Sequence, residues 1–160
     1  MPPTSRSLPA LDRLRRRFRH HEWATSALAG ALAVTPDPAA LRAAAHAVAA
    51  DRVWHRRLTG APVDVEVWPD LDAPAVAALA AETAGKGRAF LDGLESDAAL
   101  DRTVAYQNTR GVPFQTAVAD VLDHVLLHAA HHRGQANAAL RAAGATPPAL
   151  DFVAWARAHP

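Results

Sequence analysis

Residues 120–135 read DVLDHVLLHAAHHRGQ, and they hold four of the nine histidines of this 160-residue chain. No other stretch of the sequence gathers so many side chains that can bind a metal or move a proton. Apolar residues recur through it at steps of three and four, which is typical of an amphipathic helix. We therefore predict a long helix from near Val112 to Ala143, ended by Gly144.

The helical repeat separates the four histidines into two pairs. At about 100° per residue, with His128 at zero, the apolar positions span about 20° to 120° and His132 falls at about 40°. His124 and His131 fall at about 320° and 300°, just outside that arc. Histidines at i and i+4 are a natural helical chelate, since both rings project from one face. His128 and His132 are thus candidate metal ligands, although a polar seam or buried hydrogen bonds would show the same spacing.

The residues inside this pair argue against one class of enzyme. The thermolysin-type pattern places a glutamate between its two zinc-binding histidines, where it acts as the base. Here Ala129, Ala130 and His131 occupy those positions. We therefore do not interpret the pair as the site of a metalloprotease.

The same periodicity predicts three earlier helices, at about 8–34, 38–58 and 72–94. His21 lies on the inward stripe of the first, as a hydrogen-bonded core residue or as a pocket residue. His46 lies among alanines on the second. Taken alone it is a core histidine or a metal ligand, and the histidine cluster near the end of the chain favours the ligand. Between the third helix and the last one we expect a short extended crossover rather than a true sheet.

Composition limits the class of protein. The net charge of +1 gives no general basis for binding nucleic acid or acidic lipid. The arginine cluster at 13–19 is then a solvated helix face, with an anion contact as the alternative. The chain has no cysteine, which excludes disulfides and thiolate ligands and fits a cytoplasmic protein. No stretch approaches the roughly eighteen apolar residues that span a membrane. We expect residues 1–9 to be a disordered lead-in and 10–160 to form one domain.

The quoted stretch resembles the signature of the DinB/YfiT-like family. That signature has a histidine, then Asn-His, then a His-Arg-Gly-Gln block, a late glycine and an aspartate. The matching residues here are His124, His128, His132, Arg133, Gly134, Gln135, Gly144 and Asp151. Segments 21–24, 46–60 and 106–111 also resemble family segments. The chain departs from the pattern at Leu127, where asparagine is common, and at His21, where asparagine or tyrosine is common.

The resemblance implies an all-α fold. We expect a four-helix bundle in up-down-down-up order, often dimeric, with a short C-terminal helix after the last long one. It also implies one divalent metal per chain, held by His46, His128 and His132 with a fourth position open, as catalytic zinc sites require. Zinc and nickel suit imidazole best, and manganese and iron are alternatives.

Further residues acquire candidate roles from the same resemblance. Six would orient a ligand histidine or line the pocket: His124, His131, Gln135, His21, Asp51 and Trp54. Arg133 falls near 140° on the last helix, away from the two inward histidines. It is a candidate contact for a substrate carboxylate, or it forms a structural ion pair.

The better-understood members of that family use low-molecular-weight thiols. The resemblance therefore implies a metal-dependent thiol S-transferase or isomerase that acts on a small electrophile. A metal lowers the pKa of a bound thiol, and a chain without cysteine must take its thiol from a cosubstrate. Two alternatives are a metal-dependent hydrolase or lyase that activates water, and a non-catalytic metal- or ligand-binding stress protein.

Overall fold

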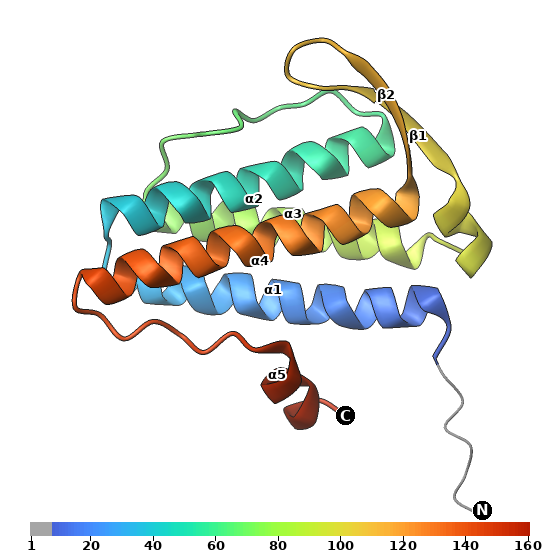
Figure 1. Cartoon of the computed structure of the whole chain (residues 1–160). Coiled ribbons are helices and arrows are strands. Elements are labelled where there is room, and N and C mark those ends of the chain that lie inside the picture. The colour runs from blue at the N-terminus through green and yellow to red at the C-terminus, as the bar shows by residue number, and fades with distance from the viewer. Residues whose placement is uncertain (1–7) are drawn as a thin grey trace, which may run out of the picture.

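The computed structural model describes residues 8–160, so the predicted lead-in lies mostly outside the described residues. The described chain is mostly helical (Figure 1). Its long helices are α1 (Ala10–Val34), α2 (Pro38–Thr59), α3 (Ala73–Asp92) and α4 (Val118–Ala142). A 3-10 helix η1 (Asp97–Asp101) follows α3, and the predicted short C-terminal helix is present as α5 (Phe152–Ala158).

The long helices pack so that each has two main neighbours. Both α1 and α2 pack against α3 and against α4. After α2, residues 61–72 carry the chain back along that helix, so that α2 and α3 run in one direction and α1 and α4 in the other (Figure 1). Within the part of the chain that is described, none of the helices is long and apolar enough to cross a bilayer.

Side-chain caps explain where three of these helices begin. Asp37 and Asp72 each accept a hydrogen bond at 2.9 Å from the backbone N–H three residues on, and a proline follows each cap. The start of α1 is capped by a residue far away in the sequence. The two carboxylate oxygens of Asp97 accept the backbone N–H groups of Ala10 and Leu11, each at 2.9 Å. Gly60 ends α2 with a φ of 68°, which a residue with a side chain rarely adopts.

The core has an alanine-rich face on α2 opposite larger side chains. Residues 43–50 of α2 are all buried. Leu28, Leu32 and Leu140 from α1 and α4 are 2% exposed or less and pack into the same cluster. Small side chains on α2 allow a close approach of helices, which brings the histidines of α2 and α4 within reach of each other.

The predicted crossover is a true two-stranded sheet, and this part of the prediction was wrong. Strands β1 (Thr103–Gln107) and β2 (Pro113–Ala117) pair antiparallel, with Tyr106 opposite Phe114. Asn108 closes the turn, because its side-chain oxygen accepts the backbone N–H groups of Arg110 and Val112. Gly111, between Arg110 and Val112, has a φ of 76°.

The start of the last helix was predicted too early for the same reason. The backbone groups of residues 113–117 are paired with β1, so α4 begins at Val118 rather than near Val112. The hydrophobic repeat that suggested a longer helix includes Phe114, which instead lies against Tyr106 with ring centroids 5.9 Å apart. A short apolar run fits either structure, and the pairing across the turn decides it.

Candidate metal centre

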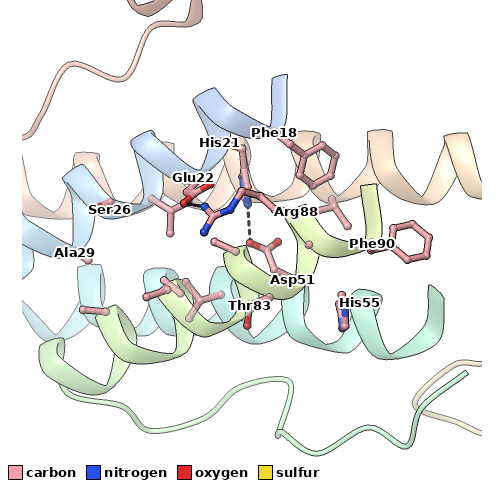
Figure 2. Close-up of a pocket in the computed structure, with 18 of the residues that line it drawn as sticks. Phe18, His21, Glu22, Ser26, Ala29, Asp51, His55, Thr83, Arg88 and Phe90 are labelled. Carbon is pink, nitrogen blue, oxygen red and sulfur yellow. Dashed lines mark hydrogen bonds and ion pairs between the residues drawn. The ribbon is translucent and has the colours of Figure 1, made fainter. Parts of the chain in front are cut away.

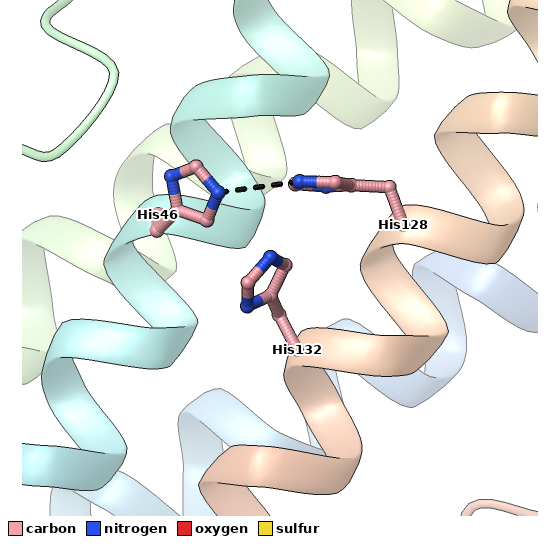
Figure 3. Close-up of side chains that lie close together, drawn as sticks. All are labelled: His46, His128 and His132. Carbon is pink, nitrogen blue, oxygen red and sulfur yellow. Dashed lines mark hydrogen bonds between the residues drawn. The ribbon is translucent and has the colours of Figure 1, made fainter.

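Three histidines from two helices meet between α2 and α4. His46 comes from α2, and His128 and His132 come from adjacent turns of α4 (Figure 3). One ring nitrogen of each lies within 4.8 Å of the others. The Nε2 atoms of His46 and His128 are 3.2 Å apart. Two nitrogens bound tetrahedrally to zinc at its usual bond length lie about 3.3 Å apart. The arrangement can therefore hold a metal ion.

Hydrogen bonds on the far side of two rings decide which nitrogen faces the site. His46 Nδ1 lies 2.7 Å from the carbonyl oxygen of Val67, which can only accept, so Nδ1 carries the proton. His132 Nδ1 likewise donates to Gln135 Oε1 at 2.7 Å. The Nε2 atom of each ring is then unprotonated, which is the form that binds a metal.

The burial of His128 and His132 favours the neutral form of both rings. His128 has its pKa lowered to about 4, mainly by burial and then by its neighbours His132, His46 and His124. Burial also lowers the pKa of His132. His128 Nδ1 is buried and has no hydrogen-bond partner among residues 8–160. The neutral imidazoles of His128 and His132 need no proton removed from a cation before they bind a metal.

A loop residue that was not predicted from the sequence covers one of the candidate ligands, His46. Trp68 stacks on His46 with ring centroids 3.6 Å apart and planes within 6° of parallel. The guanidinium of Arg42 lies over the Trp68 ring, 5.0 Å from the ring centre. Val67 and Trp68 both lie in the segment 61–72, so this loop both orients and covers His46. A tryptophan among prolines and valines carries no periodic signal that would have placed it here.

Aromatic side chains continue from the ligands toward the hairpin. The His124 ring lies 5.4 Å from that of His128 and 5.0 Å from that of Trp54. Trp54 in turn contacts Tyr106 of β1 at 5.2 Å and lies under the guanidinium of Arg57. Burial, and then the charge of Arg57, lower the pKa of His124. The two predicted pocket residues His124 and Trp54 therefore lie side by side next to His128, and we call their two rings the wall of the histidine cluster.

The remaining predicted residues have different surroundings. His131 is exposed and contacts the amide nitrogen of Gln135 at 3.0 Å, so it supports the residue that orients His132. Arg133 is 6% exposed, and its Nη1 donates to His21 Nδ1 at 2.9 Å and lies 3.2 Å from Thr25 Oγ1. The guanidinium thus faces α1 in the core. These contacts support a structural role for Arg133, but through hydrogen bonds to neutral groups rather than through the expected ion pair.

The other predicted pair, His21 and Asp51, continues this core network. Because Arg133 donates to His21 Nδ1, the proton of this ring is on Nε2, which donates to Asp51 Oδ2 at 3.0 Å. Both side chains are about nine-tenths buried. His21 therefore joins α1 to α2 through its bond to Asp51. Its ring also connects the carboxylate of Asp51 to the guanidinium of Arg133, so that the two opposite charges balance on the side of the bundle that faces α1.

The DinB family model matches residues 34–159 of the chain, which include α2, the hairpin, α4 and all three clustered histidines. The chain belongs to the DinB family. The resemblance inferred from the His-Arg-Gly-Gln block is therefore confirmed. Membership also suggests a metal-binding protein, in agreement with the histidine cluster. No curated protein and no solved structure matches the chain.

Proposed function

We propose that the chain binds one divalent metal ion on His46, His128 and His132 and acts as a thiol S-transferase or isomerase on a small electrophile. The observation that carries the proposal is the fixed tautomer of two ligands. Val67 and Gln135 hold the Nδ1 protons of His46 and His132, which leaves their Nε2 atoms free for the metal. Three neutral nitrogen ligands suit zinc or nickel and leave a position for a substrate.

The metal, when bound, supplies a Lewis acid that lowers the pKa of a thiol at neutral pH. The protein contributes position and shape. Trp68 covers the face of His46, and Gln135 fixes the ring of His132. The wall of Trp54 and His124 offers flat apolar surface to an electrophile beside His128. Since the chain has no cysteine, the thiol must come from a cosubstrate.

We also propose that the four long helices form the family's up-down-down-up bundle and that two copies associate. The directions of the helices in Figure 1 support the bundle. Association is carried over from the family resemblance, and Leu127, which is 72% exposed on α4 next to His128, is the residue at which we test it. Equilibrium sedimentation of the chain and of a Leu127→Glu variant tests this, because a dimer held there would dissociate in the variant. A cytoplasmic location stays a prediction.

The test of the proposed function begins with metal content. The protein is purified from medium supplemented with zinc and nickel, beside His46→Ala and His132→Ala. We expect about one metal ion in the wild type and strong loss in both variants, with helicity kept in all three. A wild-type protein that carries no metal and binds none on titration would overturn the proposal.

Turnover separates the enzyme from its alternatives. Monobromobimane is offered with glutathione, cysteine and other small thiols, with and without added metal. Thiol-dependent conjugation that needs the metal and is lost in His128→Ala supports a transferase. Metal binding without any thiol-dependent turnover would favour the non-catalytic alternative, and hydrolysis of ester probes without thiol would favour a hydrolase.

A further inference from the structure

A cavity of about 420 Å³ lies between α1, α2 and α3, and Leu122 and Val125 of α4 complete its lining (Figure 2). None of the three clustered histidines is among the described residues that line it. Small side chains leave the space, since its walls include Ala29, Ala80, Ala84 and Gly87. Its volume lies within the range of sites that hold small organic molecules. The cavity is therefore a second candidate site, separate from the metal centre.

Two buried oxygens in this cavity have no partner. Thr83 of α3 is 7% exposed, and its Oγ1 makes no hydrogen bond within residues 8–160. Asp51 of α2 binds His21 through Oδ2, but its buried Oδ1 lacks a partner in the same part of the chain. Both residues line the cavity, and Figure 2 shows Asp51 in the middle of the group. A third lining residue, His55 of α2, has a buried ring nitrogen, Nδ1, that also lacks a partner within residues 8–160. Buried polar atoms are nearly always paired, so unpaired ones around one apolar cavity indicate a missing partner.

The charges around the cavity define what that partner is. Asp51 is balanced by Arg133 through the ring of His21. Glu22 and Arg88, which connect α1 to α3 beside the cavity, pair with each other. Burial, and then the charge of Arg52, lower the pKa of the lining residue His55, which favours its neutral form. No net charge therefore remains for an ionic ligand to neutralise. Because Asp51 Oδ1 can only accept, the partner must donate a hydrogen bond.

We propose that this cavity binds a neutral, mostly apolar small molecule with a hydroxyl group. The hydroxyl donates to Asp51 Oδ1, the hydroxyl of Thr83 pairs with the same polar end, and the body of the ligand fills the space beside Phe18 and Ala84. Binding here does not require the metal, since none of the clustered histidines contributes.

Two probes that differ by one donor test the recognition. β-Naphthol has an apolar body and one hydroxyl, and β-naphthyl methyl ether has the same body without the donor. Each is titrated calorimetrically into the full chain in EDTA. We expect β-naphthol to bind at least about tenfold more tightly than the ether, because the ether leaves Asp51 Oδ1 unpaired. Thr83→Val keeps the shape of the side chain but removes its hydroxyl, and it should weaken the binding of β-naphthol by about two- to tenfold.

A matched pair of variants on α3 tests the location. A Cβ added at Gly85 or at Gly87 meets nothing within 4 Å, yet only Gly87 is among the described lining residues. Leucine at either position should favour the helix. We expect Gly87→Leu to weaken β-naphthol at least about tenfold, since the side chain occupies part of the space, and Gly85→Leu to leave the affinity unchanged.

His128→Ala separates this proposal from the metal centre and should bind β-naphthol like the wild type. Four results would overturn the proposal: no binding of β-naphthol, equal binding of both probes, unchanged binding in Gly87→Leu, or lost binding in a folded His128→Ala protein. The last result would place the probe at the histidines.

Discussion

Replacing Gln135 by leucine tests whether a fixed proton on His132 sets the metal affinity. Gln135 Oε1 accepts the Nδ1 proton of His132 at 2.7 Å, which keeps Nε2 unprotonated. Leucine removes this acceptor and is itself a good helix former. Groups that orient a ligand histidine typically contribute about 10- to 100-fold in affinity. Because Gln135 is exposed, water can replace part of the lost bond. We therefore expect the low end, about tenfold, which corresponds to about 1.4 kcal/mol.

The assay is a competition titration of zinc against a chromophoric chelator near neutral pH. Gln135→Glu is the matched control, because its carboxylate accepts the same proton and should keep or raise the affinity. His131→Ala removes the other partner of Gln135 and should change the affinity less than twofold, since Oε1 is untouched. Circular dichroism shows that each variant keeps its helices. An affinity for Gln135→Leu within twofold of wild type would refute the reasoning.

Three further predictions concern stability. Arg133→Met leaves the buried charge of Asp51 without its balance across His21, so urea denaturation should show a loss of roughly 3–5 kcal/mol. A loss below 1 kcal/mol would contradict that network. Leu140→Ala empties a site that is 0% exposed and should lower stability by about 2–5 kcal/mol in the same experiment. The pKa of His128 is lowered from 6.5 to about 4, so the unfolded chain takes up this proton first. Metal-free protein should thus lose stability as pH falls from about 6.5 toward 4, and less so in His128→Ala; equal pH profiles would contradict this.

The histidine pair on α4 could be predicted because its geometry is local. Positions 128 and 132 lie one helical turn apart whatever the rest of the chain does, and the apolar repeat shows which side is inward. His46 is different, because eighty-two residues separate it from His128. Its place beside them depends on how α2 packs on α4, which helical periodicity does not determine. From the residues alone it was therefore one of two alternatives, and the family resemblance assigned it to the site.

The features that could not be predicted from the sequence lie in segments without a clear hydrophobic repeat. The segment 61–72 has neither a helical nor a strand repeat, yet its path places the Val67 carbonyl and the Trp68 ring on His46. The hairpin was missed for a related reason. Val104 and Tyr106 alternate as in a strand, but a stable pair needs the partner strand beyond the turn, and Phe114 also fitted a helical repeat.

His132 and Arg133 are adjacent on α4 but face different sides of the bundle. Neighbours on a helix point about 100° apart, so His132 reaches the metal centre beside α2 while Arg133 reaches His21 on α1. Through His21, Arg133 also balances the carboxylate that lines the cavity. The two proposed sites therefore share the helices α2 and α4 but no side chain. A change confined to His132 or Gln135 acts on the metal, and one at Gly87 acts on the cavity, so either proposal can fail while the other stands.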